Sequence, residues 1–303
     1  MDKVKAMQTF VRIVEANSYS KAAETLDLPR ASLTATMQNL EAFLGTQLLQ
    51  RTTRRLSLTP DGAQYYKQCV EILTAIETAE RSFLGPEAKR PQGKLRVDLP
   101  GALGRDVVLP QIAEFHAAYP EVDLMISLTD RLVDLIQEGI DCVLRVGHLQ
   151  DSSMVGRQIG TMRFVTCAAP SYLARHGAPH HIGDLPNHRG VVHFSGRTGR
   201  PFDWEFMVGG ELLKINISGP IGVNDADANV TCALQGLGLA QTAIYQVRHY
   251  LDNGKLVQVL PDVPPTSMPI SLLYPQGRMA APKLSVFAAW LATLFEKDAD
   301  LRL

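Results

Sequence analysis

Residues 18–41 read SYSKAAETLDLPRASLTATMQNLE and contain two short helical patterns separated by the turn DLPR. In the first pattern Ser18 or Ser20 can cap the helix, and the small side chains of Ala22 and Ala23 permit close helix packing. Pro29 cannot continue that helix but suits the first turn of the next one. This stretch therefore predicts a helix, a tight turn and a second helix.

The second of these helices has two different faces. Its apolar residues recur at spacings of three and four, which predicts a buried stripe of Leu33, Met37, Leu40 and Leu44. The opposite face is small, polar and nearly uncharged, and it lacks the Glu and Lys pairs that support solvated helices. Such a face fits either a solvated helix or a helix that enters the major groove of DNA. Its residues and flanks are Ala31, Ser32, Thr34, Ala35, Gln38, Asn39 and Ala42.

The neighbouring segments favour the second interpretation, a helix that enters the major groove of DNA. Residues 4–16 have one apolar stripe and predict a further helix, and QRTTRRLSLT at 50–59 holds three arginines and no acid. Residues 1–60 contain eight basic and five acidic side chains, a net charge of +3, whereas the rest of the chain has 22 and 26, a net charge of -4. This asymmetry indicates a polyanionic partner for the N-terminal part only.

The pattern AA-x-x-L, a turn, a polar helix ending LE-x-x-LG at 40–45 and then LLQRTTRRLSLTPDG at 48–62 resembles the winged helix-turn-helix of LysR-type transcriptional regulators. The resemblance implies that the third helix reads the major groove and that the wing contacts the DNA backbone and minor groove. Many members carry a basic or long polar residue where this chain has Ala35, so methyl contact with thymine is expected there instead. The implied DNA-binding residues are Arg30, Ala31, Ser32, Thr34 and Ala35 on the helix, Gln38 on its outer face, and Arg51, Thr53, Arg54 and Arg55 in the wing.

A long helix is expected to follow this DNA-binding part, which spans residues 1–59. Thr59 can cap it and Pro60 can occupy its first position. Apolar residues at spacings of three and four fit equally a coiled coil and a helix packed on a domain. The family resemblance implies that this helix pairs two heads in a homodimer, with the linker and hinge ending at residue 92. The apolar residues are Tyr66, Cys69, Leu73, Ile76 and Phe83.

From Lys94 onward, strand and helix patterns alternate, which predicts an α/β body of parallel strands and crossover helices. One of the expected helices is TDRLVDLIQEG at 129–139. The layout over residues 93–296 resembles the two-lobed type 2 periplasmic-binding-protein fold of LysR effector domains. We expect an effector-binding domain at 93–303, with lobe I at about 93–162 and 267–303 and lobe II at about 163–266.

Two such lobes create a cleft where a small-molecule effector is expected to bind. The helix N-terminus after the first strand favours an anionic group, and Arg145 either pairs a ligand carboxylate or forms an internal salt bridge. The candidate effector-binding residues, where strands meet helices, are Pro100, Gly101, Ala102, Leu103, Thr129, Arg145, Val146, Gly147, His148, Phe194, Ser195, Asn224 and Asp225.

The sequence gives less support to other functions. The histidines of residues 176–193 match no metal-ligand spacing, the four cysteines form no C-x-x-C pair, and no catalytic or nucleotide-binding motif occurs. No apolar run is long enough to span a membrane, and the N-terminal residues lack the pattern of a signal peptide. We therefore expect a cytoplasmic protein. We therefore expect a DNA-binding regulator without metal or cofactor, which binds promoter DNA as a dimer or tetramer. The alternatives are a cytoplasmic small-molecule binding protein and an α/β enzyme with an accessory helical domain.

Overall fold

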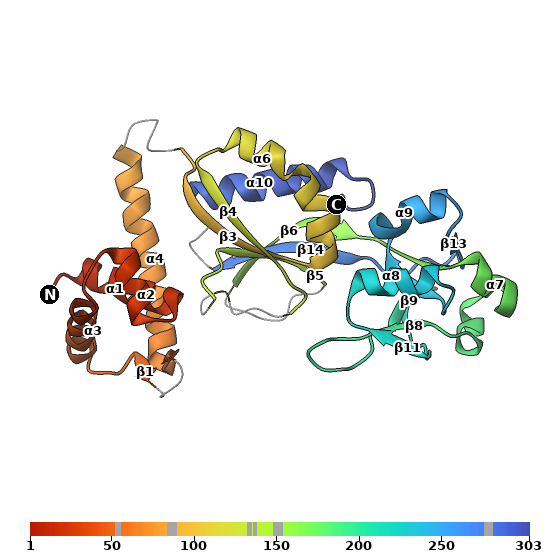
Figure 1. The fold of residues 1–303 in the computed structure, drawn as a ribbon, viewed down its shortest axis with the longest axis horizontal. Helices are drawn as coiled ribbons and strands as arrows, with labels where there is room; N and C mark the ends of the chain where they lie inside the picture. The colour runs from red at the N-terminus through yellow and green to blue at the C-terminus, as the bar shows by residue number, and fades with distance from the viewer. Residues whose placement is uncertain (52–55, 84–89, 132–134, 136–137, 148–153, 276–280) are drawn as a thin grey trace.

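The computed structural model describes residues 1–51, 56–83, 90–131, 135, 138–147, 154–275 and 281–303 of the 303-residue chain, with the backbone alone at 51, 74, 77, 78 and 81–83. An N-terminal head is joined by the long helix α4 to a body of two lobes (Figure 1). The predicted helix at 129–139 falls largely on residues 132–134 and 136–137, which lie outside the described part.

The head contains three short helices, a two-stranded wing and the start of a long helix. The elements are α1 (Lys3–Ala16), α2 (Tyr19–Leu26), α3 (Arg30–Leu44), β1 (Leu49–Arg51), β2 (Leu56–Leu58) and α4 (Pro60–Phe83). Its core joins Phe10 of α1 to Leu33 of α3 and Tyr66 of α4. The helix patterns predicted from the sequence are confirmed here, because each apolar stripe is turned into this one core.

Side-chain caps mark where α2 and α4 of the head begin. The Ser18 Oγ accepts a hydrogen bond from the Lys21 amide at 3.4 Å, which caps α2. The Thr59 Oγ1 accepts from the Gly62 amide at 2.9 Å and donates to the Gln47 carbonyl at 2.6 Å. Thr59 is therefore the predicted cap of α4, and it also fixes that helix to the end of the wing.

Lobe I is built on a five-stranded sheet in the order β4-β3-β5-β14-β6. Its strands are β3 (Gly93–Leu99), β4 (Val122–Leu128), β5 (Cys142–Val146), β6 (Met154–Met162) and β14 (Met268–Pro275). Within this sheet, the prediction of parallel strands holds for β3 with β4 and β5. Strand β14 runs antiparallel to both β5 and β6, because it returns from lobe II, and β6 was not predicted as a strand.

Helices cover this sheet. The chain winds from Gly101 to Ala118 through α5 (Gly101–Leu103), the π-helical turn η2 (Gly104–Val108), the 3₁₀ turn η3 (Leu109–Gln111) and α6 (Ile112–Ala118). Helix α10 (Pro282–Lys297) lies on the same side of the sheet as α6 (Figure 1). Phe115 of α6 packs edge-on against Phe287 of α10 with ring centroids 5.4 Å apart.

Lobe II has three small sheets instead of one parallel sheet. Strand β7 (Phe164–Ala168) pairs antiparallel with β12 (Ala240–Ala243) and β13 (Val257–Gln258), and β9 (Trp204–Val208) forms a hairpin with β10 (Glu211–Ile215). Strands β8 (Val191–His193) and β11 (Ile221–Val223) run parallel. The helical segments are α7 (Pro170–His176), η4 (Ile182–Asn187), α8 (Ala226–Leu234) and α9 (Ile244–Asp252).

Contacts beyond the connecting strands join the two lobes. Arg105 of η2 in lobe I forms an ion pair with Asp227 of α8 in lobe II. Asp300, in the tail after α10, accepts a hydrogen bond from the Arg248 Nε of α9 at 2.6 Å. Among the described residues, no helix is long and apolar enough to cross a membrane.

Candidate nucleic-acid interface and effector cleft

Helix α3 presents the polar face that the sequence predicts. Its buried side consists of Leu33, Met37 and Leu40, each 1% exposed. The outer side is solvent-accessible; Thr34 on it is half-buried, and its Oγ1 donates to the Arg30 carbonyl at 3.2 Å. The exposed residues are Arg30, Ala31, Ser32, Ala35 and Gln38.

The N-terminus of α3 is free of a side-chain cap. Pro29 stands at the cap position and makes no side-chain hydrogen bond, and the preceding Asp27 takes the left-handed conformation with φ of 52°. This turn exposes the first amides of α3, whose dipole favours a phosphate group. The geometry therefore offers an anion contact beside the Arg30 guanidinium.

The wing is attached to α3 by a contact that sequence reasoning missed. The Glu41 Oε1 accepts hydrogen bonds from the amides of Leu48, at 2.8 Å, and Leu49, at 3.1 Å. The motif LE-x-x-LG contains this glutamate, so the signal was present in the sequence. The predicted wing residues Thr53, Arg54 and Arg55 and the side chain of Arg51 lie outside the described residues.

The predicted cleft residues 100–103, at the carboxyl end of β3, differ in their exposure to solvent. Pro100 and Gly101 are partly exposed, whereas Ala102 is 7% exposed and Leu103 is fully buried in the lobe I core. The Leu103 side chain does not line a cleft in this arrangement, because it points from the first helical turn toward the sheet. Only the start of this segment faces solvent.

The helix N-terminus predicted for an anionic ligand already has a carboxylate beside it. The Gly101 amide donates to the Asp130 Oδ1 at 3.3 Å. Asp130 follows β4, so the parallel pairing of β3 and β4 brings it to the same edge of the sheet. The chain thus supplies its own anion at this position.

Arg145 forms the internal salt bridge that the sequence left as an alternative. Its Nη2 lies 2.7 Å from the Asp98 Oδ2, and the Asp98 side chain is fully buried. Asp98 also accepts hydrogen bonds from Ser127 at 2.6 Å and from the predicted residue Thr129 at 3.3 Å. Releasing Arg145 would leave a buried carboxylate without its counterion, and of the two predicted alternatives the internal salt bridge is the one present in this structure.

The predicted residues of lobe II are brought together. Strands β8 and β11 run parallel with Val223 opposite His193, so Phe194 and Ser195 emerge beside Asn224 and Asp225. The Asp225 Oδ1 accepts from the Ala228 amide at 2.8 Å and caps α8. Asn224 and Asp225 are exposed, and Phe194 and Ser195 are half-buried.

Val146 and Gly147 end β5 at the same edge as Pro100. Val146 is half-buried, and Gly147 has φ of 106°, a conformation that favours glycine. The Gly147 amide donates to the Pro269 carbonyl at 2.9 Å, which fixes this turn beside β14. The predicted residue His148 lies outside the described residues.

Two titratable residues between the lobes were not among the residues predicted from the sequence for the cleft. Burial lowers the pKa of His193, and the carboxylates of Asp130 in lobe I and Asp225 in lobe II partly oppose that shift. Burial strongly raises the pKa of Tyr245, and Asp106 and Asp130 add to the shift. Both rings thus lie where lobe I carboxylates approach lobe II. Within the described chain, no three potential metal-ligating side chains gather to hold an ion.

A helix-turn-helix head with a wing, followed by a two-lobed α/β body, defines a DNA-binding regulator that carries a ligand-binding domain. Residues 4–63 match the family "Bacterial regulatory helix-turn-helix protein, lysR family", and residues 88–296 match "LysR substrate binding domain". The chain belongs to the LysR family of transcriptional regulators. This family is one of regulators, which sets aside the enzyme alternative.

Relatives of full length support the assignment. The chain is 36% identical over 301 residues to the uncharacterized HTH-type transcriptional regulator YhjC of Escherichia coli K12, covering 99% of this chain and 100% of that protein. It is 36% identical over 303 residues to the HTH-type transcriptional repressor PA14_22550 of Pseudomonas aeruginosa UCBPP-PA14, covering 100% and 95%. The structure of CrgA, a LysR-type regulator from Neisseria meningitidis, matches with a TM-score of 0.60 at 29% identity, covering 95% and 97%.

Proposed function

We propose that two copies of α3 lie in successive major grooves of promoter DNA and read its sequence. The observation that carries this proposal is the exposed, uncharged outer face of α3 from Ala31 to Gln38, held outward by the burial of Leu33, Met37 and Leu40. Arg30, Ser32, Thr34 and Gln38 donate or accept hydrogen bonds at base edges, and Ala31 and Ala35 contact thymine methyl groups. Arg51, Thr53, Arg54 and Arg55 of the wing contact phosphates or the minor groove.

The pairing of two heads is assigned to the later part of α4. Tyr66, Cys69 and Val70 are buried in the head core. The first apolar residues of α4 are therefore not available for a dimer interface. Farther along, Ile72 is 43% exposed and Ile76 is half-buried. These residues support a homodimer in which the ends of the two α4 helices pack together, and dimers then associate through the body as a tetramer.

We assign the effector site to the cleft between the lobes, and we propose the domain limits 1–59, 60–92 and 93–303. Its support is the convergence of Pro100, Gly101, Val146, Gly147 and Thr129 from lobe I with residues 194, 195, 224 and 225 from lobe II. The effector would bind one lobe arrangement better than another and so shift the dimer geometry on DNA. Because chromosomal DNA is its partner, the regulator would act in the cytoplasm.

A gel shift tests the DNA-binding part of this proposal. The full chain is titrated against the intergenic DNA upstream of its own gene and against a scrambled duplex of the same length and composition. We expect the upstream DNA to bind at least about 1,000-fold more tightly, the lower end of the usual specificity ratio. Equal affinity for the two duplexes would contradict sequence reading by α3.

A further inference from the structure

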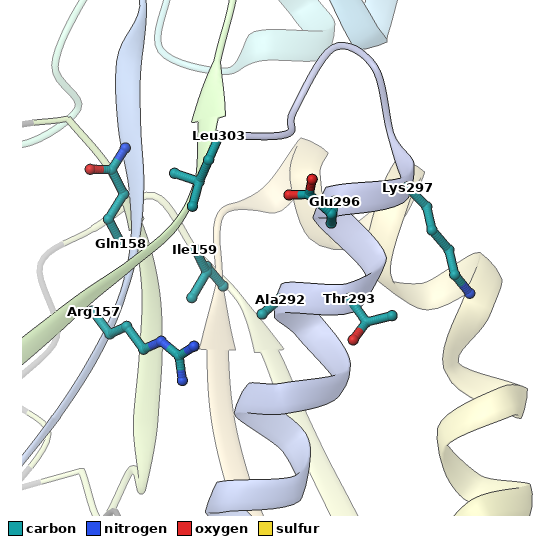
Figure 2. A pocket seen from close by; sticks show the side chains of 8 residues that line it. All are labelled: Arg157, Gln158, Ile159, Ala292, Thr293, Glu296, Lys297 and Leu303. Carbon is teal, nitrogen blue, oxygen red and sulfur yellow. The ribbon is translucent and has the colours of Figure 1, made fainter.

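A groove with a volume of about 380 Å³ lies on lobe I, between the edge strand β6 and the C-terminal half of α10 (Figure 2). Its volume lies within the range of small-molecule sites, about 300–1,000 Å³. None of the cleft residues discussed above lines it. The groove is therefore separate from the proposed effector site between the lobes.

Each wall of the groove combines an apolar residue with a charged one. Arg157 and Ile159 line the groove from β6, beside the register shift in its pairing with β14, and Ala292 and Glu296 are four apart on α10 and so share one face of the helix. In Figure 2 Arg157 and Glu296 stand on opposite sides, with Ile159 and Ala292 between them. A cation and a carboxylate thus flank an apolar floor.

These two charges have no partners in the part of the chain that the structure describes. Arg157 and Glu296 form an ion pair neither with each other nor with another described residue. Two other pairs of exposed charges on the body do form ion pairs, Arg131 with Glu138 and Lys214 with Glu205. A third charged side chain of the lining, Lys297, points away from Ile159 and Ala292 (Figure 2), so Arg157 and Glu296 are the two charges that flank the apolar floor.

We propose that this groove binds a small aliphatic amino acid, with its carboxylate on Arg157, its ammonium group on Glu296 and its hydrocarbon chain over Ile159 and Ala292. An arginine can hold a carboxylate through two parallel hydrogen bonds. A simple carboxylate would be repelled by Glu296, and a simple amine by Arg157, whereas a zwitterion pairs both. The proposal goes beyond the function assigned above, because it adds a second ligand site.

The position of the groove would allow such a ligand to change the relative orientation of the two lobes. Leu303 lines the groove at the end of the tail that follows α10. This tail is held by lobe I through the Thr161 amide, which donates to the Leu301 carbonyl at 2.7 Å, and by lobe II through Arg248, which pairs with Asp300. A ligand against the tail therefore contacts a segment that both lobes hold, and it would favour one relative orientation.

Isothermal titration of the full chain, without DNA, with two isomers tests the proposal. Norleucine carries both charged groups on one carbon, whereas 6-aminohexanoate carries them at opposite ends of its chain, as Arg157 and Glu296 lie on opposite sides of the groove. We expect 6-aminohexanoate to bind with a Kd of about 1 mM, as befits so small a ligand, and norleucine to bind about tenfold more weakly. Hexanoate and hexylamine, which each lack one charge, should bind about tenfold or more weakly.

Substitutions then locate the site. Arg157→Gln and Glu296→Gln should each weaken the bound isomer about tenfold, while Lys255→Gln and Glu211→Gln, exposed positions in lobe II, serve as matched charge controls and should not. The proposal is overturned if 6-aminohexanoate does not bind with a Kd below about 10 mM, if norleucine or hexanoate binds as well as 6-aminohexanoate does, or if the Arg157 and Glu296 variants bind like the controls. The gel shift above remains independent of each result, so failure here leaves DNA recognition standing.

Discussion

The Glu41 carboxylate at the end of α3 accepts a hydrogen bond from the Leu48 amide at 2.8 Å, and so connects α3 to the wing. Replacing Glu41 with Ala should leave the amides of Leu48 and Leu49 without this acceptor and speed their hydrogen exchange, since a lost buried hydrogen bond costs about 1–3 kcal/mol. Exchange measured by NMR or mass spectrometry checks this. Glu24→Ala, on the exposed side of α2, is the control, and equal protection of the two amides in both variants would refute the role of Glu41.

The wing arginines are expected to bind phosphates. Replacing Arg54 and Arg55 with Ala should weaken binding to specific and nonspecific DNA alike, and should lower the slope of log affinity against log salt by about 2, because each phosphate contact contributes about 0.9. Gel shifts over a series of salt concentrations give this slope. Lys255→Ala removes a cation in lobe II and should leave the slope unchanged. A slope equal to that of the unmodified protein would remove these arginines from the phosphate contacts.

The outer face of α3 should determine sequence preference. Changing Thr34 to Val removes its hydroxyl while keeping its shape, and should cost about 1–3 kcal/mol at one base pair of the operator. Selection of binding sequences from a randomised duplex library, performed with both proteins, shows the change as a relaxed position. Uniform weakening at every sequence, with the same preferred site, would assign Thr34 to helix stability instead.

The buried Asp98 and Arg145 pair should contribute strongly to lobe I stability. Asp98→Asn leaves the Arg145 guanidinium, 15% exposed, without its counterion, and should lower the free energy of unfolding by about 3–5 kcal/mol. Urea unfolding followed by tryptophan fluorescence and circular dichroism measures the change. Glu138→Gln, which breaks the exposed pair with Arg131, should have little effect because solvent screens that pair. Comparable losses in the two variants would contradict this interpretation.

The stability of the body should fall in mild acid because of His193. Its folded pKa is lowered by burial, so the unfolded chain binds the proton more readily. The stabilisation is complete above the ordinary histidine value near 6.5, and it decreases as pH falls through 6.5 toward the lowered folded value. Unfolding midpoints between pH 8 and 5 (about the range where histidine titrates) should show this slope, and His193→Gln should reduce it. An unchanged slope in that variant would show that other groups cause it.

The sequence by itself determined the elements of the head and the family. Helical periodicity, the Thr59 cap and the DLPR turn are local signals, because the residues that fix them lie within one or two helical turns of each other. The uncharged face of α3 could also be predicted, since the stripe of Leu33, Met37 and Leu40 fixes which side points outward.

Only the tertiary structure decided which charges in the body are available. Arg145 and Asp98 lie far apart in the chain, and β3 and β5 bring them together in the sheet; likewise Asp130 reaches the Gly101 amide only because β3 and β4 run parallel. The mixed sheet of lobe I depends on β14, which returns from lobe II after more than a hundred intervening residues. Pairing between segments far apart in the chain leaves no periodic pattern in the sequence of the paired strands. The sequence could therefore identify most strands of the body, though not β6, and it could not identify their partners or the free charges beside them.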